Sequence, residues 1–364
     1  MDRTLLTVAF LAVVLSEIIA NGLVPEVNLS LVQCAALSLS LGSKVTYPRS
    51  SEYLASTNSY FSAQERSLSP RCIVRANTST DVATAVKTLS ILYNVSKSPK
   101  CRFAVRSGGH TPAGGWANID GGVTLDLSAL NATTVSKDSS TVFVGPGAGW
   151  SDISKKLDSL NLAVAGGRVS DVGVGGLSLG GNELASQTQL LTSANESLGG
   201  MSFFSPRRGW ACDGVVNFEI VTANGRILNA NAKENSDLWT ALRGGSNNFG
   251  VVTRLDLTTF NQGKLWGGGI FYPISTAAEQ IAAFYGLITA TPYDEFASIT
   301  QIFGFSPSTG AGTLNFAVYT KPIENPPTYQ PFTKIRPQLF NTFRTSNLTD
   351  FTDEQAALSL TGLR

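Results

Sequence analysis

The spacing of apolar residues along the chain predicts a mixture of helices and strands. Apolar residues recur at every third or fourth position, as on one face of a helix, in segments 31–41, 80–92, 151–160, 236–242 and 277–289. Short alternating or continuous apolar runs predict strands at 72–74, 103–105, 122–127, 141–144, 215–221, 226–228, 250–257, 269–272 and 314–319. The pair Asn224-Gly225 between two of these runs is a strong hairpin signal. Residues 47–70 and 322–331 show neither period, and we expect them to be irregular. The pattern of apolar and polar residues changes at about Gly268. After it, strand-like runs and a helix predict a second α+β domain.

The run Arg106-Ser107-Gly108-Gly109-His110, at the end of a predicted strand, carries the clearest chemical signal. Paired glycines let the backbone approach a ligand closely, and consecutive N–H groups in such a turn form an anion site. The arginine and the serine hydroxyl add further donors, and His110 is the only histidine in the sequence. The pattern favours a phosphate-bearing ligand held beside a nucleophilic imidazole. A strand that ends in a plain glycine turn is the alternative.

A second glycine-dense stretch runs from Gly166 to Gly181. Its Gly173-Val174-Gly175 segment does not fit the dinucleotide-binding fingerprint, because the third glycine is misplaced and no clear strand-turn-helix unit surrounds it. A flexible linker is the alternative, but linkers are usually polar, whereas these glycines alternate with valine and leucine. We therefore interpret the stretch as a second loop that faces a phosphate or a ring.

Composition and targeting signals limit the class of protein to which this sequence can belong. The net charge is +1 with 15% charged residues, so nothing indicates the basic surface that nucleic-acid binding requires. Residues 1–20 resemble a secretory signal peptide whose apolar core is too short to span a membrane. We expect a secreted, extracellular glycoprotein with no membrane span after signal removal. Glycosylation sequons begin at Asn28, Asn77, Asn94, Asn131, Asn195 and Asn347.

The cysteines predict disulfide bonding rather than a metal site. Cys34, Cys72, Cys101 and Cys212 are widely spread, and with a single histidine they make a zinc site improbable. In a secreted protein disulfides are the default. Spacing does not give the connectivity; our expectation is Cys34–Cys101, which would tie the N-terminal segment to the central strand.

Three separated motifs, namely 106–110, 166–181 and 237–253, occur in an order that resembles the FAD-linked oxidases of the vanillyl-alcohol oxidase superfamily. The resemblance is strongest to the fungal berberine-bridge-enzyme-like group and runs from about Cys34 to Phe260. It implies a two-subdomain FAD-binding module of the PCMH type at residues 21–262. An incomplete α+β substrate-binding domain with an antiparallel sheet would follow at residues 263–364.

The resemblance also implies roles for individual residues. The 106–110 loop would wrap the FAD pyrophosphate, and His110 would bond covalently to the flavin. Val169 stands where many relatives carry a second flavin-linked cysteine, so we expect a single link. Val172 matches the position that gates oxygen access. The implied cofactor-binding residues are Arg106, Ser107, Gly108, Gly109, His110, Val172, Gly173, Gly175, Gly176, Gly250, Val251 and Val252.

By resemblance, the reaction would be hydride transfer from a hydroxyl-bearing small molecule to flavin N5, with O₂ as the acceptor. The substrate would be a carbohydrate or a secondary metabolite. A base such as tyrosine or a carboxylate would take the hydroxyl proton. Tyr272, Gln301 and Tyr319 lie in the substrate region, but the sequence assigns none of them. We expect no metal. The alternative is a non-catalytic or degenerate flavin-binding protein from an incomplete gene model.

Two departures from the family pattern support that alternative. Removing residues 182–199 restores the pattern, and the segment can be back-translated with intron-like ends, so we hypothesise an unspliced intron. A genuine surface loop is the rival explanation. Relatives also continue beyond the position of Arg364 and return to the FAD domain. Without that return, we expect unpaired strand edges in the substrate sheet.

Overall fold

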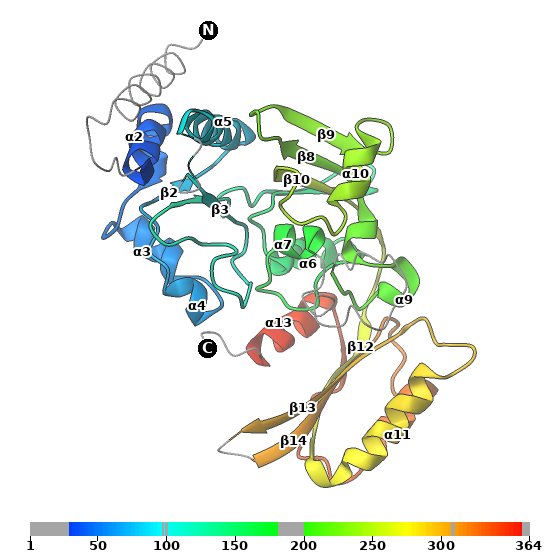
Figure 1. Cartoon of the computed structure of the whole chain (residues 1–364). Helices are drawn as coiled ribbons and strands as arrows, with labels where there is room; N and C mark the ends of the chain where they lie inside the picture. The colour runs from blue at the N-terminus through cyan, green and yellow to red at the C-terminus, as the bar shows by residue number, and fades with distance from the viewer. Residues whose placement is uncertain (1–28, 97, 99–100, 181–199, 307–309, 359–364) are drawn as a thin grey trace.

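The computed structural model describes residues 29–96, 98, 101–180, 200–306 and 310–358 (Figure 1). The predicted signal peptide and the hypothesised intron at residues 182–199 lie outside the described residues, and both stay predictions.

The first layer of the molecule is a four-stranded sheet in the order β1-β2-β4-β3. Its strands are β1 (Val45–Thr46), β2 (Cys72–Arg75), β3 (Phe103–Arg106) and β4 (Val123–Asp126). β4 pairs in parallel with both β2 and β3. Two helices, α2 (Leu29–Leu41) and α5 (Ser79–Ser96), pack on this sheet. Their apolar residues share one buried cluster with β2 and β4, which is the outcome that the helical spacing predicts.

The segment 47–70 is helical in part, so the expectation of an irregular segment was wrong. It contains α3 (Ser51–Asn58) and α4 (Ala63–Arg66). The hydroxyl of Ser50 accepts a hydrogen bond from the Tyr53 backbone N–H, and Ser62 likewise caps α4. Serine caps stabilise helix starts. Ser50 and Ser62 were therefore the features of the sequence that could have predicted these two helices. The helices are too short and too polar to show an apolar period. The 322–331 segment similarly holds the short turns η4 (Pro327–Tyr329) and α12 (Gln330–Thr333).

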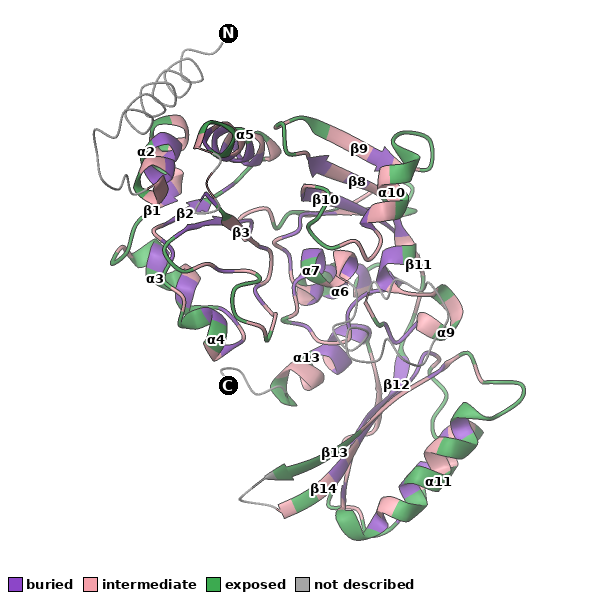
Figure 2. Cartoon of the chain, in the orientation of Figure 1, coloured by how far each residue is buried: buried purple, intermediate pink, exposed green. Residues whose placement is uncertain are grey.

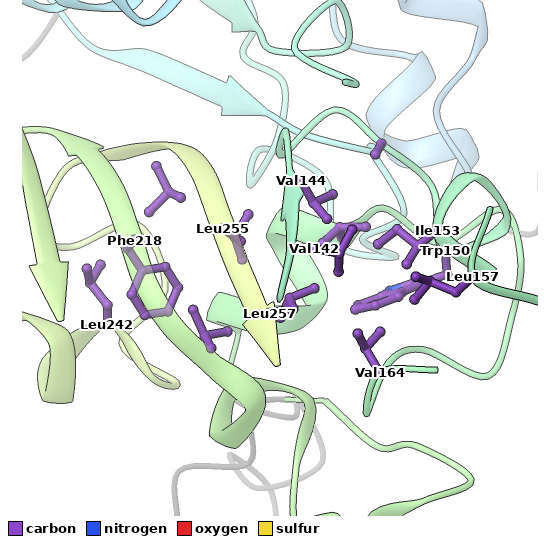
Figure 3. Packing of buried hydrophobic residues seen from close by; sticks show 14 of the residues in the cluster. Val142, Val144, Trp150, Ile153, Leu157, Val164, Phe218, Leu242, Leu255 and Leu257 are labelled. Carbon is purple, nitrogen blue, oxygen red and sulfur yellow. The ribbon is translucent and has the colours of Figure 1, made fainter. Parts of the chain in front are cut away.

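The second layer is a five-stranded antiparallel sheet in the order β5-β6-β10-β8-β9. Its strands are β5 (Thr133–Val135), β6 (Thr141–Val144), β8 (Val215–Val221), β9 (Ile227–Asn231) and β10 (Val251–Thr258). β8 and β9 form the predicted hairpin, and Gly225 at its turn has a φ of +78°. Around the sheet lie α6 (Trp150–Asp158), α7 (Val174–Leu179), α9 (Ser205–Arg208), η2 (Ala211–Gly214) and α10 (Ser236–Leu242). Figure 3 shows the core between the sheet and α6.

The third layer is a separate antiparallel sheet in the order β13-β14-β12-β15, with β16 also on β12. Its strands are β12 (Leu265–Pro273), β13 (Ala297–Ser306), β14 (Gly310–Tyr319), β15 (Phe340–Asn341) and β16 (Arg344–Ser346). After β12 come η3 (Ile274–Thr276) and α11 (Ala277–Ile288), which covers one face (Figure 1). Within the described residues β13 pairs only with β14 and has a free edge, where Phe305 is 76% exposed. Figure 2 shows that this end of the sheet is exposed.

The other face of the third sheet is joined to the first part of the chain. The strands β7 (Leu162–Ala163) and β11 (Phe260–Asn261) pair just before β12 begins. Helix α13 (Leu348–Leu358) lies against α6, where the hydroxyl and backbone N–H of Thr349 donate to the Asp158 carboxylate. A buried cluster of Phe203, Phe204, Phe316 and neighbours crosses this junction. The mixed α+β architecture is therefore as predicted.

The disulfide pairing differs from the expected one. Cys34 on α2 is bonded to Cys72 on β2, not to Cys101. Cys101 is buried, and its sulfur lies 3.2 Å from the Ser96 hydroxyl at the end of α5. The packing of α2 over β2 decides the pairing, because a disulfide needs Cα atoms about 6 Å apart, and those of Cys34 and Cys72 are 6.0 Å apart. This proximity is not visible in sequence spacing.

Within the described residues, no helix has the length and apolar character needed to cross a membrane. In the same part of the chain, histidine, cysteine, aspartate and glutamate side chains nowhere gather in a group of three that could hold a metal ion.

Candidate functional site

The two glycine-rich loops predicted from the sequence meet backbone to backbone. A Cβ atom placed on Gly108 would lie 2.5 Å from the Cα of Gly173, and one placed on Gly173 would lie 2.6 Å from the Cα of Gly108. Real Cβ atoms do not approach this closely, so both positions require glycine. The loop after β3 and the loop before α7 are therefore one structural unit.

A third loop completes this unit. The hydroxyl of Ser107 donates to the carbonyl oxygen of Pro146, in the turn between β6 and α6. A Cβ on Gly175 would lie 2.7 Å from the Ser107 hydroxyl oxygen, whereas a Cβ on Gly176 would meet no protein atom within 4 Å. The backbone N–H of Val174 donates to the Ala148 carbonyl at 2.9 Å. The hydrogen bonds thus fix all three loops relative to one another.

His110 lies at the edge of this unit in a partly enclosed position. Its ring stacks on Phe61, with centroids 4.1 Å apart and an angle of 15° between the planes. Its Nε2 atom is buried, has no hydrogen-bond partner among the described residues, and lies 3.9 Å from Oδ1 of Asp171. Burial lowers the pKa of His110 below its ordinary value, and the nearby Asp171 charge partly opposes this. His110 is therefore neutral near pH 7, with the nitrogen lone pair that nucleophilic attack needs.

Arg106 is part of the scaffold rather than a free anion-binding group. Its guanidinium donates to the carbonyl oxygen and hydroxyl of Ser56 and to the hydroxyl of Ser59 at 2.7 Å. It also lies 4.1 Å above the centre of the Tyr60 ring. These contacts use Nη1 and Nη2, whereas Nε is buried without a hydrogen-bond partner among the described residues, so the geometry favours Arg106 as a clamp between β3 and α3. The phosphate-binding role that we expected for it stays a prediction.

The remaining predicted cofactor residues are dispersed between loop and core. Val251 and Val252 begin β10, and their side chains are buried in the first and second cores respectively. Gly250 has a φ of +143°, and a Cβ there would lie 2.4 Å from the Val221 carbonyl oxygen. Val172 packs against the second core, and its carbonyl oxygen accepts from the Trp150 N–H. Any contact of these residues with a cofactor would therefore involve backbone atoms for the most part.

The polar candidates of the third sheet face away from this site. Tyr272 is fully buried against α12, where its hydroxyl donates to the Phe332 carbonyl oxygen, and burial raises its pKa to about 12. Gln301 donates to the Gln280 carbonyl oxygen on α11. Tyr319 packs in the α11-side cluster. None of the three is placed to act as a base towards the loops.

The sequence reasoning missed the importance of four residues. Tyr60 and Phe61 contact Arg106 and His110, and the adjacent Tyr-Phe pair in a polar segment was the available signal. Asp171 and Arg168 lie in the glycine-dense loop, and they are its only charged residues. The sequence shows that both residues lie in this loop. It does not show that Asp171 approaches His110 or that Arg168 contacts β13.

One serine in this loop fits a different motif but not its chemistry. Gly176-Leu177-Ser178-Leu179-Gly180 matches the Gly-x-Ser-x-Gly pattern of serine hydrolases. Ser178 lies inside α7 with 0% exposure, not on an exposed turn between strand and helix. A nucleophile must be reachable by the substrate, so Ser178 cannot serve as one here.

The unit fits FAD on its own geometry. The missing side chain of Gly176 leaves open space, with nothing within 4 Å, and the buried Nε2 of His110 has no hydrogen-bond partner among the described residues. In this arrangement the 107–110 and 173–176 backbones would hold the cofactor, and His110 could attach to it.

Comparison with known proteins agrees with this geometry. A family model for the FAD binding domain matches residues 70–231. An FAD-dependent monooxygenase of Cercospora beticola is 40% identical over 337 residues, covering 90% of this chain and 60% of the relative. An FAD-dependent monooxygenase of Emericella nidulans is 36% identical over 326 residues, covering 89% and 63%. This chain thus spans less than two thirds of the length of these relatives.

Solved structures show the same fold. The 6-hydroxy-D-nicotine oxidase of Arthrobacter nicotinovorans matches with a TM-score of 0.72 at 22% identity, covering 88% of this chain and 65% of that one. A xylooligosaccharide oxidase of Myceliophthora thermophila matches with a TM-score of 0.66 at 23% identity, covering 86% and 61%. Residues 70–231 thus match the FAD binding domain, the chain is similar to fungal FAD-dependent monooxygenases, and its fold is that of oxidases of solved structure.

Proposed function

We propose that this protein oxidises a hydroxyl-bearing small molecule, a carbohydrate or a secondary metabolite, with FAD attached covalently through His110. The observation that carries the proposal is the buried, unpartnered Nε2 of His110 beside the Gly108–Gly173 contact. When bound, FAD supplies a two-electron hydride acceptor, with O₂ as the final acceptor.

The chain's own residues have separable tasks in this proposal. Ser107 and the glycine backbone position the cofactor, and Phe61 holds the His110 ring in one plane. Asp171 lies within ion-pair distance of Nε2 and can stabilise the imidazole whenever it carries a proton. The small Val172 side chain is the group that we propose to leave oxygen access open.

We also propose that the protein is secreted. Four predicted glycosylation sites, at Asn77, Asn94, Asn131 and Asn347, are exposed in the structure. Exposure is necessary for a mature glycan. Digestion with an endoglycosidase, followed by mass measurement of the protein secreted by a eukaryotic host, tests this.

The decisive experiment for the flavin is direct. The purified full chain is denatured in acid, and the pellet is examined for yellow colour. Colour in the pellet of the wild type, and its absence from a His110→Ala variant, is the expected result. A protein that folds but carries no flavin contradicts the proposal. Flavin without reduction by any hydroxyl compound would favour the non-catalytic alternative.

A second candidate activity is monooxygenation. It is favoured by the relatives at 36–40% identity, which are FAD-dependent monooxygenases. The two activities differ in the fate of oxygen. An oxidase releases one H₂O₂ per substrate oxidised, whereas a monooxygenase places one oxygen atom from O₂ in the product. Labelled O₂ and mass spectrometry of the product distinguish them.

A further inference from the structure

Arg168 links the glycine-dense loop to the third sheet. Its Nη1 donates to the hydroxyl of Thr300 on β13 at 2.6 Å. The loop around it is fixed by backbone contacts: the Gly166 N–H donates to the Ser202 hydroxyl at 3.1 Å, and the Ser170 N–H donates to the Thr352 carbonyl at 3.2 Å. The guanidinium is therefore held in a defined place between two layers of the protein.

Arg168 lacks an acidic partner among the described residues, as does Arg207, which donates to the Thr320 hydroxyl. Arg254 is paired with Asp256 at 2.7 Å, and Arg344 is paired with Asp350 at 2.7 Å. Within the described residues, no carboxylate lies within 4.0 Å of Arg168. Burial lowers the pKa of Arg168 below its ordinary value. Four of its five N–H donors are not used by the contact with Thr300.

The sheet surface beside Arg168 is apolar and open. Side chains of directly opposed residues in an antiparallel pair point to the same face, and Thr300 opposes Phe316, which faces the first part of the chain. Ile302 and Leu314 are the next opposed pair on that face, and Phe271 opposes Leu314 from β12. Ile302 is 48% exposed, and Leu314 and Phe271 are half-buried. Arg344 also lies on this face, opposite Gly267, but it is paired with Asp350 and Glu354. Among the described residues, Arg168 is therefore the cation at the border of this surface that has no carboxylate partner.

The same short segment also reaches His110. Asp171 lies three residues after Arg168 and contacts the imidazole, while Arg168 contacts β13. A molecule that lies on the apolar face beside Arg168 would therefore border the loop whose Asp171 approaches His110, the proposed flavin anchor.

We propose that Arg168 binds a carboxylate of the substrate, so that the substrate is a mainly apolar small molecule that carries both a carboxylate and the hydroxyl to be oxidised. The inference rests on the proposed function and names its substrate class. A guanidinium matches a carboxylate with two parallel hydrogen bonds. A neutral carbohydrate would leave the cation unpaired and the Ile302–Leu314–Phe271 surface without an apolar partner.

The test uses two probes of one shape. 4-(Hydroxymethyl)benzoate and 4-(hydroxymethyl)benzamide are titrated into the FAD-loaded full chain under anaerobic conditions, with calorimetry and flavin absorbance as readouts. The wild type is expected to bind the carboxylate about tenfold more tightly than the amide. In Arg168→Gln this preference falls to about onefold, while the affinity for the amide stays within about twofold. Arg168→Lys keeps the positive charge but loses the paired N–H donors of the guanidinium. This variant is expected to retain part of the preference for the carboxylate over the amide.

Matched controls keep the test interpretable. Arg226→Gln removes an exposed arginine in the β8–β9 turn and should leave the preference intact. Melting temperature and flavin content verify that each variant is folded.

Equal binding of both probes by the wild type, binding of neither, or an unchanged preference in Arg168→Gln overturns the proposal. A changed flavin midpoint potential with an unchanged preference would assign Arg168 to the cofactor instead. Because binding is measured, absence of turnover would count against the proposed function alone.

Discussion

Gly108 and Gly173 lie so close that a single methyl group on either would sit about one bond length too near the backbone of the other, at 2.5 Å and 2.6 Å. The two residues are far apart in the chain, one after β3 and one before α7. Their contact joins the strand end of the first layer to the helices of the second. The two glycine loops can pack this closely because neither position carries a side chain, and the hydrogen bonds of Ser107 and Val174 to the β6–α6 turn fix them further.

Substituting Gly108 tests this contact. Gly108→Ala must push the two loops apart, because the added Cβ meets backbone atoms that cannot rotate away. We expect a loss of roughly 2–3 kcal/mol in unfolding free energy and loss of most bound flavin. Denaturant unfolding and the ratio of flavin to protein absorbance measure the two effects. Gly286→Ala, in α11 where a Cβ meets nothing within 4 Å, is the control and should be neutral or slightly stabilising. Equal behaviour of the two variants would contradict the prediction.

The protonation of His110 should control flavin attachment. Burial places its pKa below the ordinary 6.5, so the ring remains neutral somewhat below that pH. We expect the attachment rate to be constant at neutral pH and to fall only below pH 6.5. The unfolding free energy should also fall as the pH drops through 6.5, because the unfolded histidine then binds protons that the folded one does not. In-gel flavin fluorescence after incubation of apoprotein with FAD gives the attachment rate.

Asp171 should act through His110. Its charge raises the pKa of His110, so Asp171→Asn should move the midpoint of the attachment profile to lower pH. The rate on the plateau should fall about tenfold if the carboxylate helps to stabilise or accept the proton. Noncovalently bound FAD, measured after acid extraction, should account for the missing flavin. An unchanged midpoint and rate would show that the 3.9 Å approach has no role in attachment.

Arg106 should be a stability residue. Arg106→Lys keeps the charge but loses the paired donors to Ser56 and Ser59 and the flat contact with Tyr60. We expect a loss of roughly 2 kcal/mol in unfolding free energy. Once the variant is folded at low temperature, its affinity for inorganic pyrophosphate should match that of the wild type. A selective loss of pyrophosphate binding without loss of stability would restore the role that the sequence suggested.

The Cys34–Cys72 disulfide closes a segment with a sequence separation of 38. Its removal by the double substitution Cys34→Ser and Cys72→Ser should cost roughly 4 kcal/mol of stability through the unfolded state. Reductant should destabilise the wild type and leave the double variant unchanged. Peptide mapping without reduction should recover the two cysteines linked and Cys101 as a thiol. A linked Cys34–Cys101 peptide would contradict the structure.

Local patterns were enough to predict much of the fold. The apolar period over 80–92 and the Asn224-Gly225 turn depend on neighbours within a few residues, and α5 and the β8–β9 hairpin formed as expected. The short helices α3 and α4 were missed, because serine caps rather than an apolar face mark their starts.

The sequence by itself determined which residue types the candidate site contains: glycine pairs, one histidine, and three motifs whose order resembles that of FAD-linked oxidases. Only the tertiary structure decided what those residues contact. It assigned Arg106 to α3 and Tyr60, brought Asp171 to His110, turned Tyr272 towards α12, and paired Cys34 with Cys72. Each of these outcomes depends on how separate layers pack. Packing brings together residues that are distant in the chain, so the local spacing of apolar residues cannot predict these contacts.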